Sequence, residues 1–182
     1  AVLFLMKLQV VMIACATLKR PSLILKTLKR MNLLLDSIWG GAGQKVQKIH
    51  GKYYFHFYVP PWPSAARNVH IRKMLLQMAF PNQYPAYRSF VFLAITRKCP
   101  LRCDHCYEWD NLGQTESFSL DELKAVVDYY QRQDVLQVYF SGGEPMMRFN
   151  DLLELVMHAN KKSDCFVLTS GVNLTPGHAM LL

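Results

Sequence analysis

Acidic residues are almost absent from the first half of the sequence. Residues 1–89 contain 13 Lys and Arg but a single acid, Asp36, which gives this half a net charge of +12. Residues 90–182 contain 8 Lys and Arg against 12 Asp and Glu, a net charge of −4, and the two halves account for the total of +8. Such a change predicts two regions with different surroundings. The basic half is either a solvated face or a surface attracted to an anionic membrane, an acidic protein or nucleic acid.

A long uninterrupted hydrophobic run is also missing. Residues 1–18 are largely apolar but contain Lys7 and Gln9, which leaves the apolar stretch too short to predict a membrane span. Lys19 and Arg20 follow the run, whereas a signal peptide carries its positive charge before the apolar core. We therefore expect a helix that packs in a core or lies on a membrane surface, with any membrane contact within residues 1–30. The expected location is the cytoplasm, with membrane association left open.

The sequence lacks the even, dispersed set of cysteines that a disulfide framework uses. It has five cysteines, three of which lie within a short segment. This distribution favours a reducing compartment and a metal site. Cys15 and Cys165 are isolated in apolar sequence, and we expect Cys165 to be a small buried hydrophobic residue.

The basic half predicts two helices and a β-hairpin between them. Apolar residues at steps of three and four predict an amphipathic helix over residues 22–38, and residues 67–79 predict a second helix. Residues 45–59 are rich in β-branched and aromatic residues around Gly51, as in a hairpin. Such a hairpin packs on a neighbouring helix more often than it stacks on bases, so nucleic acid is not expected as a partner. The prolines at residues 81–85 predict a linker.

Strand and helix patterns alternate from residue 90 onward. Ser119 and Glu122 form a capping-box pattern that predicts the start of a helix. The predicted elements are strand 90–95, helix 120–132, strand 135–140, helix 151–161 and strand 165–168. This order predicts a parallel sheet, and the apolar run at residues 90–95 predicts a strand buried on both faces. Three strands cannot close a barrel, so we expect more sequence beyond Leu182.

A motif follows each predicted strand. Cys99, Cys103 and Cys106 follow the first strand with the spacing C-x3-C-x2-C. Structural zinc sites and closed iron–sulfur clusters have four protein ligands, so three cysteines leave one coordination position open. Residues 141–145, Ser-Gly-Gly-Glu-Pro, follow the second strand, and residues 169–171, Thr-Ser-Gly, follow the third. Because the carboxyl ends of parallel strands meet at one edge of a sheet, the three motifs are expected to lie together.

Within the second motif, the two glycines and the acid have separate expected roles. Gly142 and Gly143 allow positive φ and the close approach of a ligand to the backbone. Glu144 offers a fixed acceptor that suits an ammonium group. The motif alone is a weak signal, and its value comes from following the cysteine motif by one strand.

Taken in order, the three motifs resemble the radical S-adenosylmethionine (SAM) superfamily over about residues 90–182. The resemblance implies an α/β fold, the first half of a partial (βα) TIM-like barrel with parallel strands. Residues 1–89 would then be a basic α+β extension, and residues 90–182 a core truncated after its third strand. The resemblance also implies that Cys99, Cys103 and Cys106 each bind one iron of a [4Fe-4S] cluster, with the open fourth iron bound by the amino and carboxylate groups of SAM.

The resemblance further implies which residues contact the cofactor. Gly142, Gly143 and Glu144 would hold the methionine part of SAM, with Glu144 facing its ammonium group. Ser170 would lie near the bound cofactor, at a position where the family commonly has Asn. His105 precedes the last cysteine, at a position where the family often has an aromatic residue beside the adenine.

The implied activity is reductive cleavage of SAM to methionine and a 5′-deoxyadenosyl radical, which abstracts hydrogen from an unknown substrate. The implied partners are that substrate and an external one-electron reductant, flavodoxin-like or ferredoxin-like. No catalytic residue beyond the cluster ligands is assigned. The alternative hypothesis is a non-catalytic iron–sulfur or zinc binding protein that docks a partner through its basic half and uses His105 or a distant residue as fourth ligand.

Overall fold

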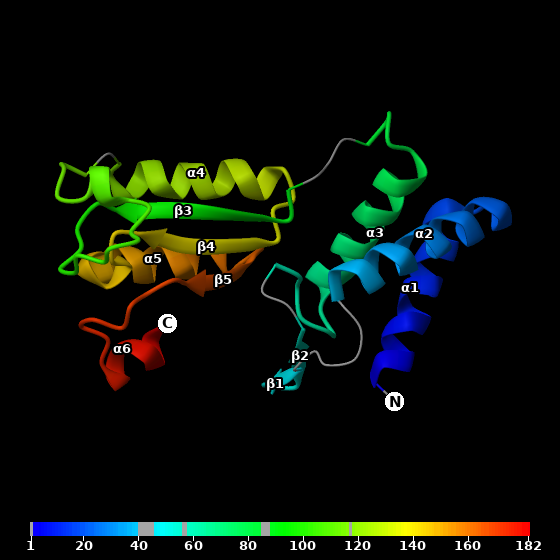
Figure 1. Cartoon of the computed structure of the whole chain (residues 1–182), viewed down its shortest axis with the longest axis horizontal. Helices are drawn as coiled ribbons and strands as arrows, with labels where there is room; N and C mark the ends of the chain where they lie inside the picture. Colours follow the sequence, from blue (N-terminus) through cyan, green and yellow to red (C-terminus); the bar gives the residue numbers. More distant parts are fainter. Residues whose placement is uncertain (1, 40–45, 56–57, 85–87, 117) are drawn as a thin grey trace. The chain divides into compact units, whose positions relative to one another are not determined.

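The computed structural model describes residues 2–39, 46–55, 58–84, 88–116 and 118–182, without the side chains of residues 33–39. The chain divides into two compact units, residues 1–87 and residues 88–182. Figure 1 shows the elements of each unit, which are described separately below.

Three helices form most of the first unit. They are α1 (Val2–Leu18), α2 (Pro21–Trp39) and α3 (Ala65–Ala79). Their shared core contains the buried side chains of Ala14, Met31, Ile71 and Leu75. The predicted helices are confirmed as elements, although the later part of the apolar stripe on α2, including Leu35, lies outside the described side chains. Among the described residues, no helix is long and apolar enough to cross a membrane.

A short hairpin precedes α3. Strands β1 (Gln47–Ile49) and β2 (Lys52–Tyr54) pair antiparallel. His50 and Gly51 connect them, both with positive φ. This confirms a hairpin within residues 45–59, with strands of three residues each. Residues 45, 56 and 57 of the predicted range lie outside the described residues.

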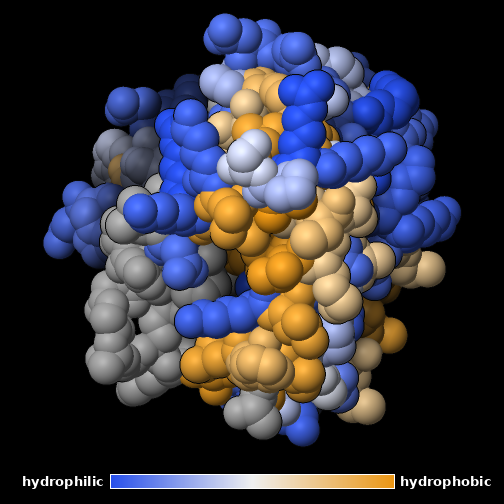
Figure 2. Space-filling view, turned by 90° about the vertical axis from the view of Figure 1, so that its right-hand side faces the viewer, coloured by the Kyte–Doolittle hydropathy of each residue, from blue (hydrophilic) through white to orange (hydrophobic). Residues whose placement is uncertain are grey.

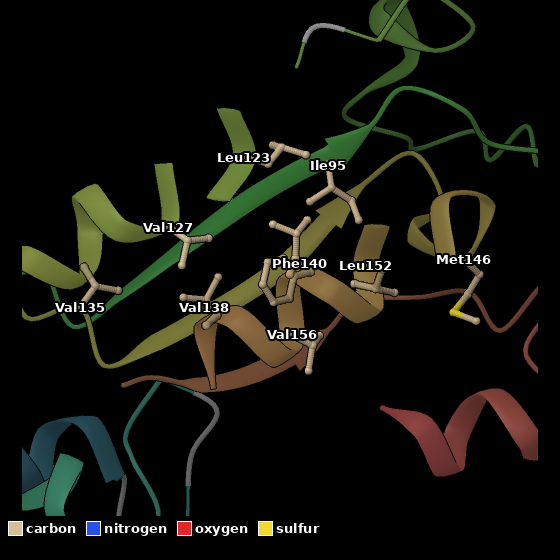
Figure 3. Close-up of a cluster of buried hydrophobic side chains, with 11 residues drawn as sticks. Ile95, Leu123, Val127, Val135, Val138, Phe140, Met146, Leu152 and Val156 are labelled. Carbon is tan, nitrogen blue, oxygen red and sulfur yellow. The ribbon is translucent and has the colours of Figure 1, made fainter. Parts of the chain in front are cut away.

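A three-stranded parallel sheet is the centre of the second unit. The strands are β3 (Phe90–Thr96), β4 (Gln137–Gly142) and β5 (Asp164–Val167), in the order β3-β4-β5. Helices α4 (Leu120–Arg132) and α5 (Phe149–Ala159) connect them. Figure 3 shows the apolar core between the sheet and these helices, to which Ile95, Phe140, Val127 and Leu152 contribute. The parallel sheet expected from the alternating pattern is confirmed.

The remaining elements of this unit are short. They are the 3₁₀ helices η1 (Trp109–Asn111) and η2 (Pro145–Arg148) and the final helix α6 (Pro176–Leu181). The capping box at α4 is confirmed, because the Ser119 hydroxyl accepts from the Glu122 N–H and the Glu122 carboxylate accepts from the Ser119 N–H.

The prediction that residues 90–95 form a strand buried on both faces is wrong. Val91, Leu93 and Ile95 face the helix-covered core, but Phe92 is 47% exposed. Phe92 belongs to an aromatic row on the opposite face, with its ring 4.9 Å from that of Tyr139 and with Tyr139 stacked 4.7 Å from Phe166. A strand with one exposed face usually alternates apolar and polar residues in its sequence. Here the second face carries aromatic residues, so the sequence shows a continuous apolar run without that alternation.

Strand β4 lies two residues later than predicted. Val135 is buried in the core but precedes the strand. The strand continues through Ser141 and Gly142, which pair with Ala94 and Thr96 of β3. Part of the glycine motif therefore belongs to the sheet itself.

Candidate functional site

The cysteine motif lies on the loop that follows β3. Cys103 is exposed, Cys99 and Cys106 are half-buried, and all three are free thiols. The Cys106 N–H donates to the Cys103 carbonyl at 3.1 Å, so these two cysteines share one tight turn. In the part of the chain that the structure describes, no group of three or more His, Cys, Asp or Glu could hold a single metal ion. Three accessible thiols on one loop nevertheless fit the donor chemistry of an iron–sulfur cluster, which distributes its thiolate ligands over different irons.

Glu116 closes the base of this loop. Its carboxylate accepts from the Thr96 hydroxyl at 2.6 Å and from the Arg97 N–H at 3.0 Å. The Gly113 N–H donates to the Arg97 carbonyl at 2.9 Å. Glu116 thus fixes the point at which the chain leaves β3 toward the first cysteine. No local pattern marks Glu116, because its partners lie 19 and 20 residues earlier in the sequence.

The two glycines of the second motif pack directly against the start of the cysteine loop. The Gly143 N–H donates to the Thr96 carbonyl and the Glu144 N–H to the Lys98 carbonyl, both at 2.8 Å. A Cβ atom at Gly142 would collide with the Thr96 carbonyl oxygen, and one at Gly143 with that of Lys98. Gly142 also has a φ of +127°, which favours glycine. Contact between the two motifs therefore requires both glycines.

Glu144 joins the second motif to the third. Its side chain is buried, with 1% exposed. One carboxylate oxygen accepts from the Met146 N–H at 3.0 Å and from the Thr169 hydroxyl at 2.6 Å. The other accepts from the N–H and the hydroxyl of Ser170, at 2.8 and 2.6 Å. We call Glu144, Thr169 and Ser170 the carboxylate clamp. It confirms that the second and third motifs meet at the carboxyl edge of the sheet.

Hydrogen bonds keep this buried carboxyl group ionised. Burial raises the pKa of Glu144, but hydrogen bonds from Ser170, Thr169 and Met146 lower it, and the net pKa lies below its ordinary value of 4.5. Charge-assisted hydrogen bonds of this kind favour the anion. The carboxylate is therefore charged at neutral pH while both of its oxygens are bound within the protein.

The remaining predicted residues lie outside the clamp. His105 is exposed on the cysteine loop, and no described contact joins it to Glu144 or Ser170. Tyr107 is 77% exposed, and its hydroxyl lies 2.9 Å from the Ser141 hydroxyl. Trp109 is 50% exposed. Neither of these two aromatic residues is buried in the core.

Arg148 is a site residue that sequence reasoning missed. Its guanidinium donates to the carbonyl of Ile95 at 2.8 Å and to that of Phe118 at 3.0 Å. It is also paired with Asp151 at 2.6 Å. Arg148 thus ties η2 to the end of β3, next to the cysteine loop. The pair of Arg148 and Asp151 could be recognised in the sequence, because oppositely charged residues three apart on a helix can interact. The two contacts with backbone carbonyls join segments far apart in the sequence and could not.

Comparison with known proteins gives a family match and two kinds of named relative. Residues 93–182 match the family model described as the radical SAM superfamily. The chain is 47% identical over 73 residues to a PqqA peptide cyclase of Bradyrhizobium diazoefficiens, which is 38% of this chain and 18% of that protein. It is 37% identical over 87 residues to an AdoMet-dependent heme synthase of Nitratidesulfovibrio vulgaris, which is 47% of this chain and 23% of that protein. The chain therefore spans about a fifth of the length of these relatives. No solved structure matches it.

Proposed function

Residues 93–182 belong to the radical SAM superfamily, and on this premise we propose that they form the amino-terminal part of the catalytic core of a radical SAM enzyme. The observation that carries the proposal is the meeting of three motifs at one sheet edge. Hydrogen bonds link the cysteine loop to the glycine turn, and the carboxylate clamp links that turn to Ser170. The parallel sheet would be the start of a partial TIM-like barrel, and residues 1–89 a basic extension of it.

Cys99, Cys103 and Cys106 would hold a [4Fe-4S] cluster. When bound, such a cluster supplies the electron for reductive cleavage of SAM, which yields the radical that abstracts hydrogen from the substrate. The protein's part is to present three thiolates from one loop while leaving the fourth position to the cosubstrate. The backbone contacts of Gly143 and Glu144 hold the loop at its first cysteine.

The carboxylate clamp suggests a refined role for Glu144. A carboxylate offers about four acceptor sites, and Glu144 uses four hydrogen bonds within the protein. We therefore propose that Glu144 positions the glycine turn and Ser170 rather than binding the SAM ammonium with a free oxygen. Gly142, Gly143 and Ser170 would line the methionine side of the site, and the exposed ring of His105 would be available to the adenine.

The proposed partners are an external one-electron reductant, flavodoxin-like or ferredoxin-like, and a substrate of unassigned class. The matched relatives are named for a peptide cyclase and a heme synthase. These names describe different substrates, so the proposal is limited to the shared radical chemistry. We propose a cytoplasmic location, because the reducing cytoplasm keeps the cysteines of a cluster reduced.

We also propose that α1 contacts an anionic membrane surface, because Phe4, Leu8 and Met12 expose 68%, 45% and 57% of their surface along one face of that helix.

Anaerobic reconstitution of the full-length protein with iron and sulfide, followed by reduction with dithionite and addition of SAM, tests this function. The expected result is a bound cluster and formation of 5′-deoxyadenosine and methionine, both of which Cys99→Ala abolishes. Cys15→Ala, which removes an exposed cysteine of the first unit, is the matched control and should retain both. Failure to bind iron, or unchanged 5′-deoxyadenosine formation in Cys99→Ala, would overturn the proposal.

A further inference from the structure

The first unit contains an apolar groove among its three helices. The groove has a volume of about 650 Å³, within the range of sites that hold small organic ligands. Its apolar lining includes Leu3, Val10, Leu28, Ile71 and Met74. Figure 2 views the chain from the side on which α1 and α2 are drawn and shows hydrophobic residues gathered in a band between hydrophilic ones. Its described lining residues all belong to the first unit, whereas the cluster is assigned to cysteines of the second.

A buried cation lies in this apolar lining. Arg67 is only 5% exposed and belongs to the groove lining. Its Nη1 donates to the Pro60 carbonyl at 2.9 Å, and its guanidinium carbon lies 5.6 Å from the centre of the Phe55 ring. Its Nε is buried and has no hydrogen-bond partner. Among the described residues, no carboxylate is paired with Arg67, although buried charges in proteins are normally paired.

No acidic group among the described residues offsets the charge of Arg67. Burial lowers the pKa of Arg67 to about 10, so the guanidinium is charged at neutral pH. Burial, with a contribution from Arg67, lowers the pKa of His70 to about 4, so the neighbouring imidazole is neutral there. Lys7 and Lys29 also line the groove, and among the residues whose side chains the structure describes no Asp or Glu does. Over its described lining, the groove is thus an apolar cleft with three basic side chains and no acidic one.

We propose that this groove binds a single-chain carboxylate amphiphile, with the carboxylate on Arg67 and the hydrocarbon chain along the apolar lining. A planar guanidinium matches a carboxylate through its N–H donors, and in the described contacts Arg67 donates to a protein acceptor only from Nη1. Arg67 is too deeply buried for the headgroup of a lipid that remains in a bilayer to reach it. The inference does not depend on the proposed radical chemistry.

Displacement of a fluorescent, dansyl-labelled undecanoic acid from the 182-residue chain tests the proposal. Laurate, dodecanol and dodecyltrimethylammonium, each below its micelle concentration, serve as competitors with equal chain length and different head charge. Laurate is expected to compete at least about tenfold better than the other two, because only it pairs with the buried cation. Absence of probe binding, or equal competition by all three, would overturn the proposal.

Two variants locate the site. Arg67→Gln should weaken laurate binding at least about tenfold and remove its advantage over dodecanol, whereas Arg72→Gln, an exposed arginine of α3 outside the lining, should change neither. Met74→Trp fills the groove while keeping Arg67, and should abolish probe binding in a chain whose circular dichroism is unchanged. If Arg67→Gln does not fold, the competition experiment on the wild-type chain and probe binding by Met74→Trp still test the proposal. A folded Arg67→Gln that binds laurate as tightly as wild type would contradict the proposal.

Discussion

Glu144 is the residue on which the geometry of the candidate site depends most. It connects the turn after β4 to the turn after β5 through hydrogen bonds to Thr169 and Ser170. A neutral side chain of the same shape cannot reproduce this arrangement, since an amide has a donor where the carboxylate has its second acceptor. The identity of the residue therefore matters as much as its size.

Glu144→Gln should lower the free energy of unfolding by about 1–3 kcal/mol, because buried donors on Ser170 or Thr169 lose their acceptor. Urea denaturation of the second unit measures this change. Glu154→Gln is the matched control, since the Glu154 side chain is 57% exposed and is paired with Lys124. This substitution should cost less than about 1 kcal/mol. Equal costs for the two variants would show that the clamp does not stabilise the fold.

The lowered pKa of Glu144 also predicts a pH dependence. A carboxyl group whose folded pKa is depressed contributes stability that is present above its unfolded value and is lost as the pH falls through the folded value. Wild type should therefore lose stability as the pH drops below about 4.5, the ordinary value of the group. The difference in stability between wild type and Glu144→Gln, measured by urea denaturation across this range, should shrink toward low pH. A difference that stays constant would contradict the assigned pKa direction.

At the scale of elements, the glycine turn and the cysteine loop form one packed pair. Gly143→Ala should displace the loop, because the added methyl group meets the Lys98 carbonyl and lies 3.2 Å from the Cys99 Cβ. We expect reduced iron incorporation and a loss of about 1–3 kcal/mol in the free energy of unfolding. Gly177→Ala is the control, since its nearest contact is 3.7 Å away at Thr175. Normal iron incorporation by Gly143→Ala would show that this contact is dispensable.

Helix α4 depends on its capping box. Ser119→Ala removes the acceptor for the Glu122 N–H and should cost about 1 kcal/mol of stability, as measured by thermal or urea unfolding. Ser119→Asn retains a good N-cap and should cost much less. If the two substitutions destabilise equally, the hydroxyl is not acting as a cap.

The sequence predicted best those elements that depend on a pattern of neighbouring residues. The capping box at Ser119 and the apolar stripe of α4 are encoded within a few residues, and both appear in the structure. The three motifs could be placed at one sheet edge because strand order and direction follow from alternation. The clamp between Glu144 and Ser170 could not be predicted, because it depends on how two turns 26 residues apart face each other. Glu116 and Arg148 were missed for the same reason, since their partners are tertiary.

At the scale of the whole molecule, the two units differ in charge. The first unit carries almost no acid and exposes apolar side chains on α1. We expect the chain to sediment with anionic phosphatidylglycerol vesicles but not with zwitterionic ones, and to be released by high salt. Phe4→Ser should weaken this binding, whereas Met180→Ser in the second unit, 88% exposed, should not. Binding that is equal for both vesicle types would contradict the electrostatic part of the proposal.

The central claim is that three cysteines hold a cluster whose remaining iron is open to SAM. Electron paramagnetic resonance of the reduced, reconstituted protein, recorded with and without SAM carrying a nitrogen-15 amino group, tests it most directly. The account predicts that SAM changes the spectrum and that the labelled nitrogen couples to the cluster. A cluster with an unchanged spectrum, and therefore with four ligands from the protein, would contradict it.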